Sequence, residues 1–108
     1  MLSALNLFLA CIVTREEATE TCYNSCKAQK EDCETINLEE CHKLCDWAVE
    51  MVEDDPSCLR LNVDRWKCDQ NIQWECSDDT EIVGQPVENL CQKEINAFND
   101  AGCNQIEE

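Results

Sequence analysis

The chain has little glycine, proline, histidine or positive charge. Two glycines and two prolines punctuate 108 residues, and this scarcity disfavours a turn-rich all-β knot and favours helices. Eight lysines and arginines stand against 24 aspartates and glutamates, which gives a formal net charge of −16. A field of this sign repels nucleic acid and anionic membrane surfaces, so we expect neither nucleic-acid binding nor membrane insertion.

Catalytic residues are scarce as well. His42 is the only histidine, and a Ser-His-Asp or Cys-His arrangement would need a nucleophile aimed at its ring. The acidic clusters at 53–55 and 78–81 lack the alternating oxygen ligands and the central glycine of an EF-hand loop. We therefore expect a protein that is not an enzyme, with no cofactor and no metal site.

Cysteine is the residue that the chain has in abundance. Eleven cysteines in 108 residues is the density of a disulfide scaffold from an oxidising compartment, so we expect a secreted, extracellular protein. Ten of them follow a short apolar segment, and an even number can pair completely. The expected disulfide cysteines are Cys22, Cys26, Cys33, Cys41, Cys45, Cys58, Cys68, Cys76, Cys91 and Cys103.

The N-terminal segment predicts a secretory signal peptide at residues 1–14. The apolar run from Leu2 to Val13 is too short to span a bilayer but suits such a signal, and cleavage near Thr14 would remove Cys11. Residues 15–108 then form the mature disulfide-rich domain. Two alternatives stay open: a lipoprotein with a lipidated Cys11, and an ordinary first helix.

The first half of the mature chain predicts a pair of helices. Cys22, Cys26 and Cys33 share one helical face, and a second apolar stripe runs through Leu38, Cys41, Cys45, Ala48 and Val52. Asn37 is a suitable N-cap for the second helix, and Pro56 closes it.

Antiparallel helices bring together residues whose numbers have a constant sum. Cys22 with Cys45 and Cys26 with Cys41 give the same sum, which predicts two disulfide rungs. Ten cysteines can nevertheless pair in hundreds of ways, and spacing alone does not choose among them.

The second half predicts two further helices. One would begin at Pro56, with Asp55 as its cap, and carry its stripe to Cys76, although the alternation of Ile72, Trp74 and Cys76 also fits a strand. The last would run from Pro86 to Gly102. If these two helices are also antiparallel, the inner cysteines pair as Cys76–Cys91 and the outer ones as Cys68–Cys103. Cys58 is then left to pair with Cys33. The expected fold is an all-α, disulfide-rich domain of two antiparallel helical hairpins.

One apolar stripe stands apart from the cysteine faces. Leu44, Trp47 and Met51 lie at i, i+3 and i+7 on the second predicted helix. We expect them to pack against the other half of the molecule. The alternative is an exposed binding anchor, since tryptophan is enriched at the centres of protein interfaces.

Two resemblances follow from these motifs. The spacing C-x3-C … C-x3-C of Cys22, Cys26, Cys41 and Cys45 resembles the cysteine-stabilised helical hairpins of small venom toxins. The segment 26–34, leading to 38–41, is similar to that of water-borne protein pheromones of molluscs and ciliates. Both resemblances imply a secreted ligand without enzymatic activity.

We therefore expect a venom-toxin-like polypeptide that binds an extracellular receptor or channel. A secreted signalling protein and an inhibitor of a secreted enzyme are the alternatives. Toxins that block cation-channel pores usually present lysine or arginine, so the charge of −16 argues against that mechanism. An inhibitor would need a rigid exposed loop, for which residues 77–85 are the candidate.

The first testable prediction concerns the thiols of the secreted protein. All ten cysteines should be oxidised, because an odd thiol would stay reactive in an oxidising compartment. Intact-mass measurement before and after alkylation without reductant should show no added label. Two or more labelled thiols would contradict the disulfide scaffold.

Overall fold

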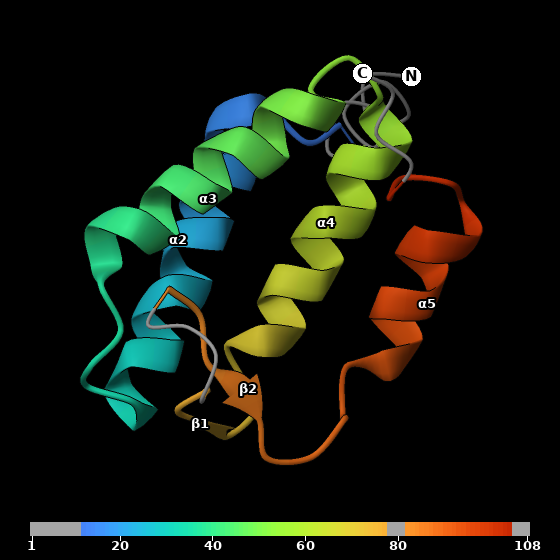
Figure 1. Ribbon diagram of the computed structural model, residues 1–108. Coiled ribbons are helices and arrows are strands. Elements are labelled where there is room, and N and C mark those ends of the chain that lie inside the picture. The colour runs from blue at the N-terminus through green and yellow to red at the C-terminus, as the bar shows by residue number, and fades with distance from the viewer. Residues whose placement is uncertain (1–11, 78–81, 105–108) are drawn as a thin grey trace, which may run out of the picture.

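The structure, a computed structural model, describes residues 12–77 and 82–104. This part of the chain folds into helices α2 (Arg15–Asp32), α3 (Leu38–Val52), α4 (Pro56–Asp69) and α5 (Gln92–Asp100), with short strands β1 (Trp74–Glu75) and β2 (Gln85–Pro86) (Figure 1). The prediction of a small, mostly helical, disulfide-rich domain is confirmed, whereas the strand pair departs from an all-α fold. Cys11, most of the predicted signal peptide and the acidic cluster at 78–81 lie outside the described residues.

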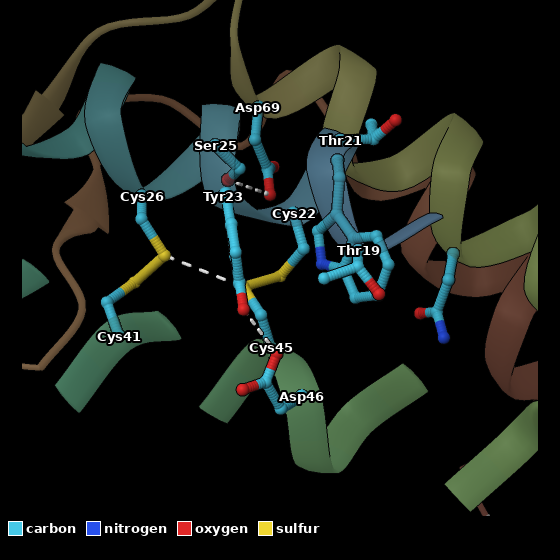
Figure 2. Close-up of a disulfide and its surroundings, with 12 residues drawn as sticks. Thr19, Thr21, Cys22, Tyr23, Ser25, Cys26, Cys41, Cys45, Asp46 and Asp69 are labelled. Atoms are coloured by element: carbon cyan, nitrogen blue, oxygen red, sulfur yellow. Dashed lines mark hydrogen bonds between the residues drawn. A yellow bond between two sulfur atoms is a disulfide. The ribbon is translucent and has the colours of Figure 1, made fainter. Parts of the chain in front are cut away.

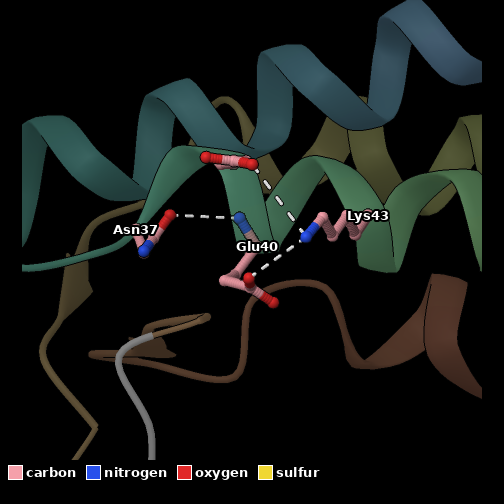
Figure 3. Close-up of polar contacts among 4 residues, drawn as sticks. Asn37, Glu40 and Lys43 are labelled. Carbon is pink, nitrogen blue, oxygen red and sulfur yellow. Dashed lines mark hydrogen bonds and ion pairs between the residues drawn. The ribbon is translucent and has the colours of Figure 1, made fainter.

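Helix α3 begins where its capping residue predicts. The side-chain oxygen of Asn37 accepts a hydrogen bond from the backbone N–H of Glu40 at 3.1 Å (Figure 3). Lys43 lies one turn further on, with its Nζ 3.5 Å from a carboxylate oxygen of Glu40 and 3.9 Å from one of Glu39. These ion pairs are exposed and add little, so the cap is the feature that fixes the first turn.

Two disulfides join α2 to α3, and both pairings predicted for this half are confirmed. Cys22 is bonded to Cys45 and Cys26 to Cys41, and the two bridges lie side by side between the helices (Figure 2). The sulfurs of Cys26 and Cys45 are 3.6 Å apart, and because neither carries a proton this is a van der Waals contact. The helices run antiparallel, as the equal sums of residue numbers require.

Helix α4 begins as predicted but ends earlier. Asp55 caps it by accepting a hydrogen bond from the N–H of Cys58 at 3.1 Å, and Pro56 occupies the first turn. The helix stops at Asp69 instead of reaching Cys76. The chain then becomes extended, because the N–H of Trp74 donates to the Asp32 carboxylate at the end of α2, at 2.9 Å.

The strand pair also displaces the predicted start of the last helix. Pro86 pairs with Trp74 in the antiparallel ladder, so α5 begins at Gln92. Gly84 permits this close pairing, because a Cβ at its position would lie 2.9 Å from the carbonyl oxygen of Glu75. At the other end Gly102, with φ of 80°, follows the end of α5 as predicted.

The remaining three disulfides differ from the prediction. Cys33 is bonded to Cys76, Cys58 to Cys103 and Cys68 to Cys91, so the predicted pairs Cys33–Cys58, Cys68–Cys103 and Cys76–Cys91 are wrong. The reason lies in the alternating directions of successive helices (Figure 1).

Helices α2 and α4 run the same way, so the start of α4 and the end of α2 lie at opposite ends of the molecule (Figure 1). Cys58, in the first turn of α4, therefore meets Cys103 after α5, far from Cys33. The strand pair brings Cys76 to Cys33 instead, which leaves Cys68 for Cys91.

The main core lies where α2 packs against both α3 and α4. Sulfur atoms and aliphatic side chains fill it, and α5 adds a smaller cluster beside α4. The buried side chains of the main core are Ala18, Cys22, Cys26, Cys33, Ile36, Cys41, Cys45, Val49, Leu59, Val63 and Trp66. Because helices far apart in sequence share this core, neither half of the chain buries it alone.

Replacing both Cys33 and Cys76 by alanine should lower the free energy of unfolding by about 2–4 kcal/mol, because the bridge closes a long loop. Chemical denaturation measures this loss. Hydrogen exchange should quicken first at the Trp74 amide, since the bridge holds β1 to α2. Peptide mapping of the wild type under non-reducing conditions tests the pairing itself, and a peptide that joins Cys33 to Cys58 would contradict the structure.

Candidate functional site

The apolar stripe on α3 is exposed. Leu44, Trp47 and Met51 keep 43%, 49% and 39% of their surface accessible, so the expectation that they pack into the core is wrong. By their spacing on α3, Trp47 and Met51 point away from Cys41 and Cys45, which bond to α2, and Leu44 lies between the two faces. The stripe is therefore a candidate binding surface, which we call the α3 stripe.

A pocket of about 450 Å³ lies between α2, α3, α4, the strand pair and the start of α5. Its volume falls in the usual range of small-molecule sites. Its apolar wall includes Leu44, Trp66, Ile72, Trp74, Val83 and Ile95. Leu44 thus belongs both to the α3 stripe and to this cavity, which we call the Asp69 pocket.

A short chain of polar groups lines one part of the Asp69 pocket. Gln29 donates to the Ser25 hydroxyl at 3.0 Å. Ser25 in turn donates to a carboxylate oxygen of Asp69 at 3.2 Å (Figure 2). The side-chain carbonyl of Gln29 accepts from the N–H of Gly84 at 2.9 Å. These bonds join α2, α4 and the strand pair around the carboxylate of Asp69.

Arg65 lies one helical turn before Asp69 and also lines the pocket. Its Nη2 donates to the side-chain oxygen of buried Asn62 at 3.0 Å, and its guanidinium carbon lies 4.8 Å from the centre of the Phe98 ring. Burial lowers the pKa of Arg65, while the nearby charge of Asp69 opposes that shift. The guanidinium is thus held by Asn62 and by an aromatic face.

The carboxyl group of Asp69 titrates well above its usual range. Burial, helped by the charge of Glu94, raises its pKa to about 6, against the attraction of Arg65 and the hydrogen bond from Ser25. A carboxylate with a perturbed pKa in a mainly apolar pocket is a common feature of binding sites.

Sequence reasoning missed the Asp69 pocket. Its walls come from five segments, and no local pattern shows that they converge. One signal was present: Arg65 interrupts the cysteine stripe of α4, and Asp69 stands four residues later, the spacing of a helical ion pair. A charged pair on a face otherwise destined for burial indicates a polar group enclosed by the fold.

The remaining candidates for chemistry are His42 and a cluster of possible metal ligands, and the contacts of both are structural. The His42 ring stacks on Tyr23 with centroids 4.0 Å apart, and the Tyr23 hydroxyl donates to Asp46 at 2.5 Å. Within the described ranges, Cys68, Cys91 and Glu94 place possible ligand atoms within 4.8 Å of one another. The two sulfurs are bonded to each other and are not thiolates, so this group makes a poor metal site.

The comparisons give no relative from which a function could be carried over. No protein-family model matches the chain, and no curated protein or solved structure is similar enough to count as a match. Of the helices in residues 12–77 and 82–104, none combines the length and apolar character needed to cross a membrane.

Stability should depend on pH through Asp69. The native carboxyl, with a pKa of about 6, holds its proton more tightly than the unfolded chain does. Its contribution to stability is therefore complete below about pH 4 and is lost as pH rises through 6. Asp69→Asn should be more stable than wild type at pH 7, by on the order of 2–3 kcal/mol.

Urea denaturation between pH 4 and 7 measures this difference, which should shrink to nearly zero at the acid end. Asp64→Asn, at an exposed position on the same helix, is the control with the same change in charge. A constant offset between wild type and Asp69→Asn across the whole range would contradict the assignment.

Proposed function

We propose that this chain is a secreted, non-enzymatic polypeptide that binds an extracellular protein through the α3 stripe. The observation that carries the proposal is the exposure of Leu44, Trp47 and Met51 on a helix fixed to its neighbour by two disulfides. Large apolar side chains gathered on an exposed helix face are typical of interaction sites. The five disulfides support an extracellular location.

The rigidity of α3 favours tight binding. Cys41 and Cys45 are one turn apart and both bonded to α2, so a partner that contacts the opposite side meets a preformed helix. Little backbone entropy is lost when such a helix binds, and Trp47 brings a large contact area with few rotatable bonds.

Charge indicates the chemistry of the partner. Asp46 and Glu50 flank Trp47 on the exposed surface of α3, and the chain as a whole carries a formal charge of −16. A fitting partner has an apolar pocket for the Trp47 ring and lysine or arginine side chains around it. Such a partner suits a receptor-directed effector of the venom-toxin type. A secreted signalling protein would use the same surface.

The surroundings of His42 and of the cysteines favour binding over catalysis. His42 stacks on Tyr23, and the ten cysteines of the described residues are all in disulfides, so neither residue type supplies an activated nucleophile. Four of the nine residues of an inhibitory loop at 77–85 lie outside the described ranges, and the α3 stripe is the better supported surface.

We also interpret the architecture as two antiparallel helical hairpins, α2–α3 and α4–α5. Two disulfides join α2 to α3, and two join α4 to the residues that flank α5, Cys91 and Cys103. The cysteine numbers in the second pair have nearly equal sums, as in the first. Cys33–Cys76 then links the two units.

Trp47→Ala should weaken partner binding by about 2 kcal/mol or more while the melting temperature stays nearly unchanged, because the side chain is half exposed. Surface plasmon resonance against a panel of extracellular receptor domains measures the loss. Leu90→Ala, at an apolar residue that is 63% exposed outside the stripe, is the control and should bind like wild type.

Affinity should also fall as ionic strength rises, since the proposed partner is basic. A partner that binds wild type and Trp47→Ala equally well would rule out the α3 stripe as its site.

A further inference from the structure

The charged side chains that line the Asp69 pocket in the described residues are Asp69 and Arg65. Asp69 lies close enough to Glu94 on α5 to be influenced by its charge, and Arg65 is the cation beside Asp69. Glu94 has a buried oxygen, Oε2, that accepts no hydrogen bond within the described ranges. Glu94 lines a neighbouring cavity together with Lys67 and Lys93, so the carboxylate offered to a ligand in the Asp69 pocket is that of Asp69.

Arg65 does not neutralise Asp69 closely. Its guanidinium donates to Asn62 and lies over the Phe98 ring, and in the described part of the chain no ion pair joins it to Asp69. The hydrogen bond that the Asp69 carboxylate receives there comes from the uncharged Ser25. The carboxylate therefore keeps capacity to accept further hydrogen bonds from a ligand.

The apolar wall beside this carboxylate includes two indole rings, those of Trp66 and Trp74. Trp74 is fixed next to the acid, because its Nε1–H donates to the backbone carbonyl of Asp69 at 2.8 Å. Indole faces attract organic cations, and Ile72 and Ile95 add hydrocarbon surface for an alkyl chain.

We propose that the Asp69 pocket binds a small apolar amine, with its ammonium group on the Asp69 carboxylate and its hydrocarbon part against Trp66, Trp74 and Ile72. A volume of about 450 Å³ accommodates a compact organic molecule and not a peptide domain. This inference goes beyond the proposed function, because the site is a cavity and needs no protein partner on the α3 stripe.

The same observations disfavour an anionic ligand. A carboxylate ligand in this pocket would lie beside the Asp69 carboxylate, and the two like charges repel each other. The formal charge of −16 would repel it before it arrived.

The test compares three probes with the same hydrocarbon chain: octylammonium, 1-octanol and octanoate. Isothermal titration calorimetry at 150 mM salt gives affinity and stoichiometry, and quenching of tryptophan fluorescence gives an independent readout near Trp66 and Trp74. Octylammonium should bind with one-to-one stoichiometry, roughly tenfold or more tightly than 1-octanol, and octanoate should bind least.

Two variants separate the pocket from the general negative charge. Asp69→Asn should weaken octylammonium binding by roughly tenfold or more and leave 1-octanol unchanged, because the amide keeps the shape but loses the charge. Asp64→Asn changes the net charge equally at an exposed position and should bind like wild type. Since Asp69→Asn should fold at least as stably, lost binding would not reflect unfolding.

Acid provides a second readout on the wild-type protein. Octylammonium stays charged from pH 5 to 8, so its affinity should fall below about pH 6 as Asp69 is protonated. The groups that face Asp69 are Arg65 on its own helix, Glu94 on α5 and the uncharged Ser25 and Gln29 on α2.

Three results would overturn the proposal. They are octanoate binding more tightly than octylammonium, equal octylammonium affinity in wild type and Asp69→Asn, and failure of octylammonium to bind. Trp47 does not line the Asp69 pocket and Asp69 is not part of the α3 stripe, so failure here and failure of partner binding by Trp47→Ala are separate outcomes.

Discussion

The paired disulfides between α2 and α3 set the positions on which both candidate sites depend. Because Cys22–Cys45 and Cys26–Cys41 lie one helical turn apart, they prevent α3 from sliding along α2 or rotating about its own axis. The side of α3 that faces α2 is thereby fixed, and so is the opposite side. Trp47 is exposed because the two disulfides fix the orientation of α3, and no contact of the Trp47 side chain is needed to hold it there.

The Asp69 pocket depends on the same constraint, because the four bridged cysteines of α2 and α3 belong to its lining. Ser25 and Gln29 are buried on α2 within a turn of Cys22 and Cys26, so fixing this helix also fixes the hydrogen bonds to Asp69. An enclosed carboxylate destabilises the domain at neutral pH, and the disulfides supply stability that can offset this. A small domain can in this way retain a polar cavity that its modest core would not support alone.

A structural feature is predictable from the sequence when the residues that determine it lie close together along the chain. The cap at Asn37, the cap at Asp55 and the rungs between α2 and α3 were predictable, because each depends on residues within one helical pair. The pairing of Cys33 with Cys76 was not, because it depends on a two-residue strand pair. That pair is held by tertiary hydrogen bonds, such as the one between Trp74 and Asp32.

The two candidate sites also differ in how far the sequence predicts them. Leu44, Trp47 and Met51 were identifiable as a group from their spacing, but whether they are buried depends on where the second half of the chain packs. That half packs against α2, and the stripe stays exposed. The pocket could not be predicted, since its walls come together only when the strand pair lies beside α2 and α4.

The disulfide pattern also determines how the molecule responds to cleavage of its backbone. The bridges Cys22–Cys45, Cys33–Cys76 and Cys58–Cys103 overlap in sequence, so every peptide bond from Cys22 to Cys103 is spanned by at least one of them. A single cut by an extracellular protease anywhere in that interval leaves one covalently continuous molecule. The two segments on either side of the cut would stay at high effective concentration, which favours the packing they had before cleavage.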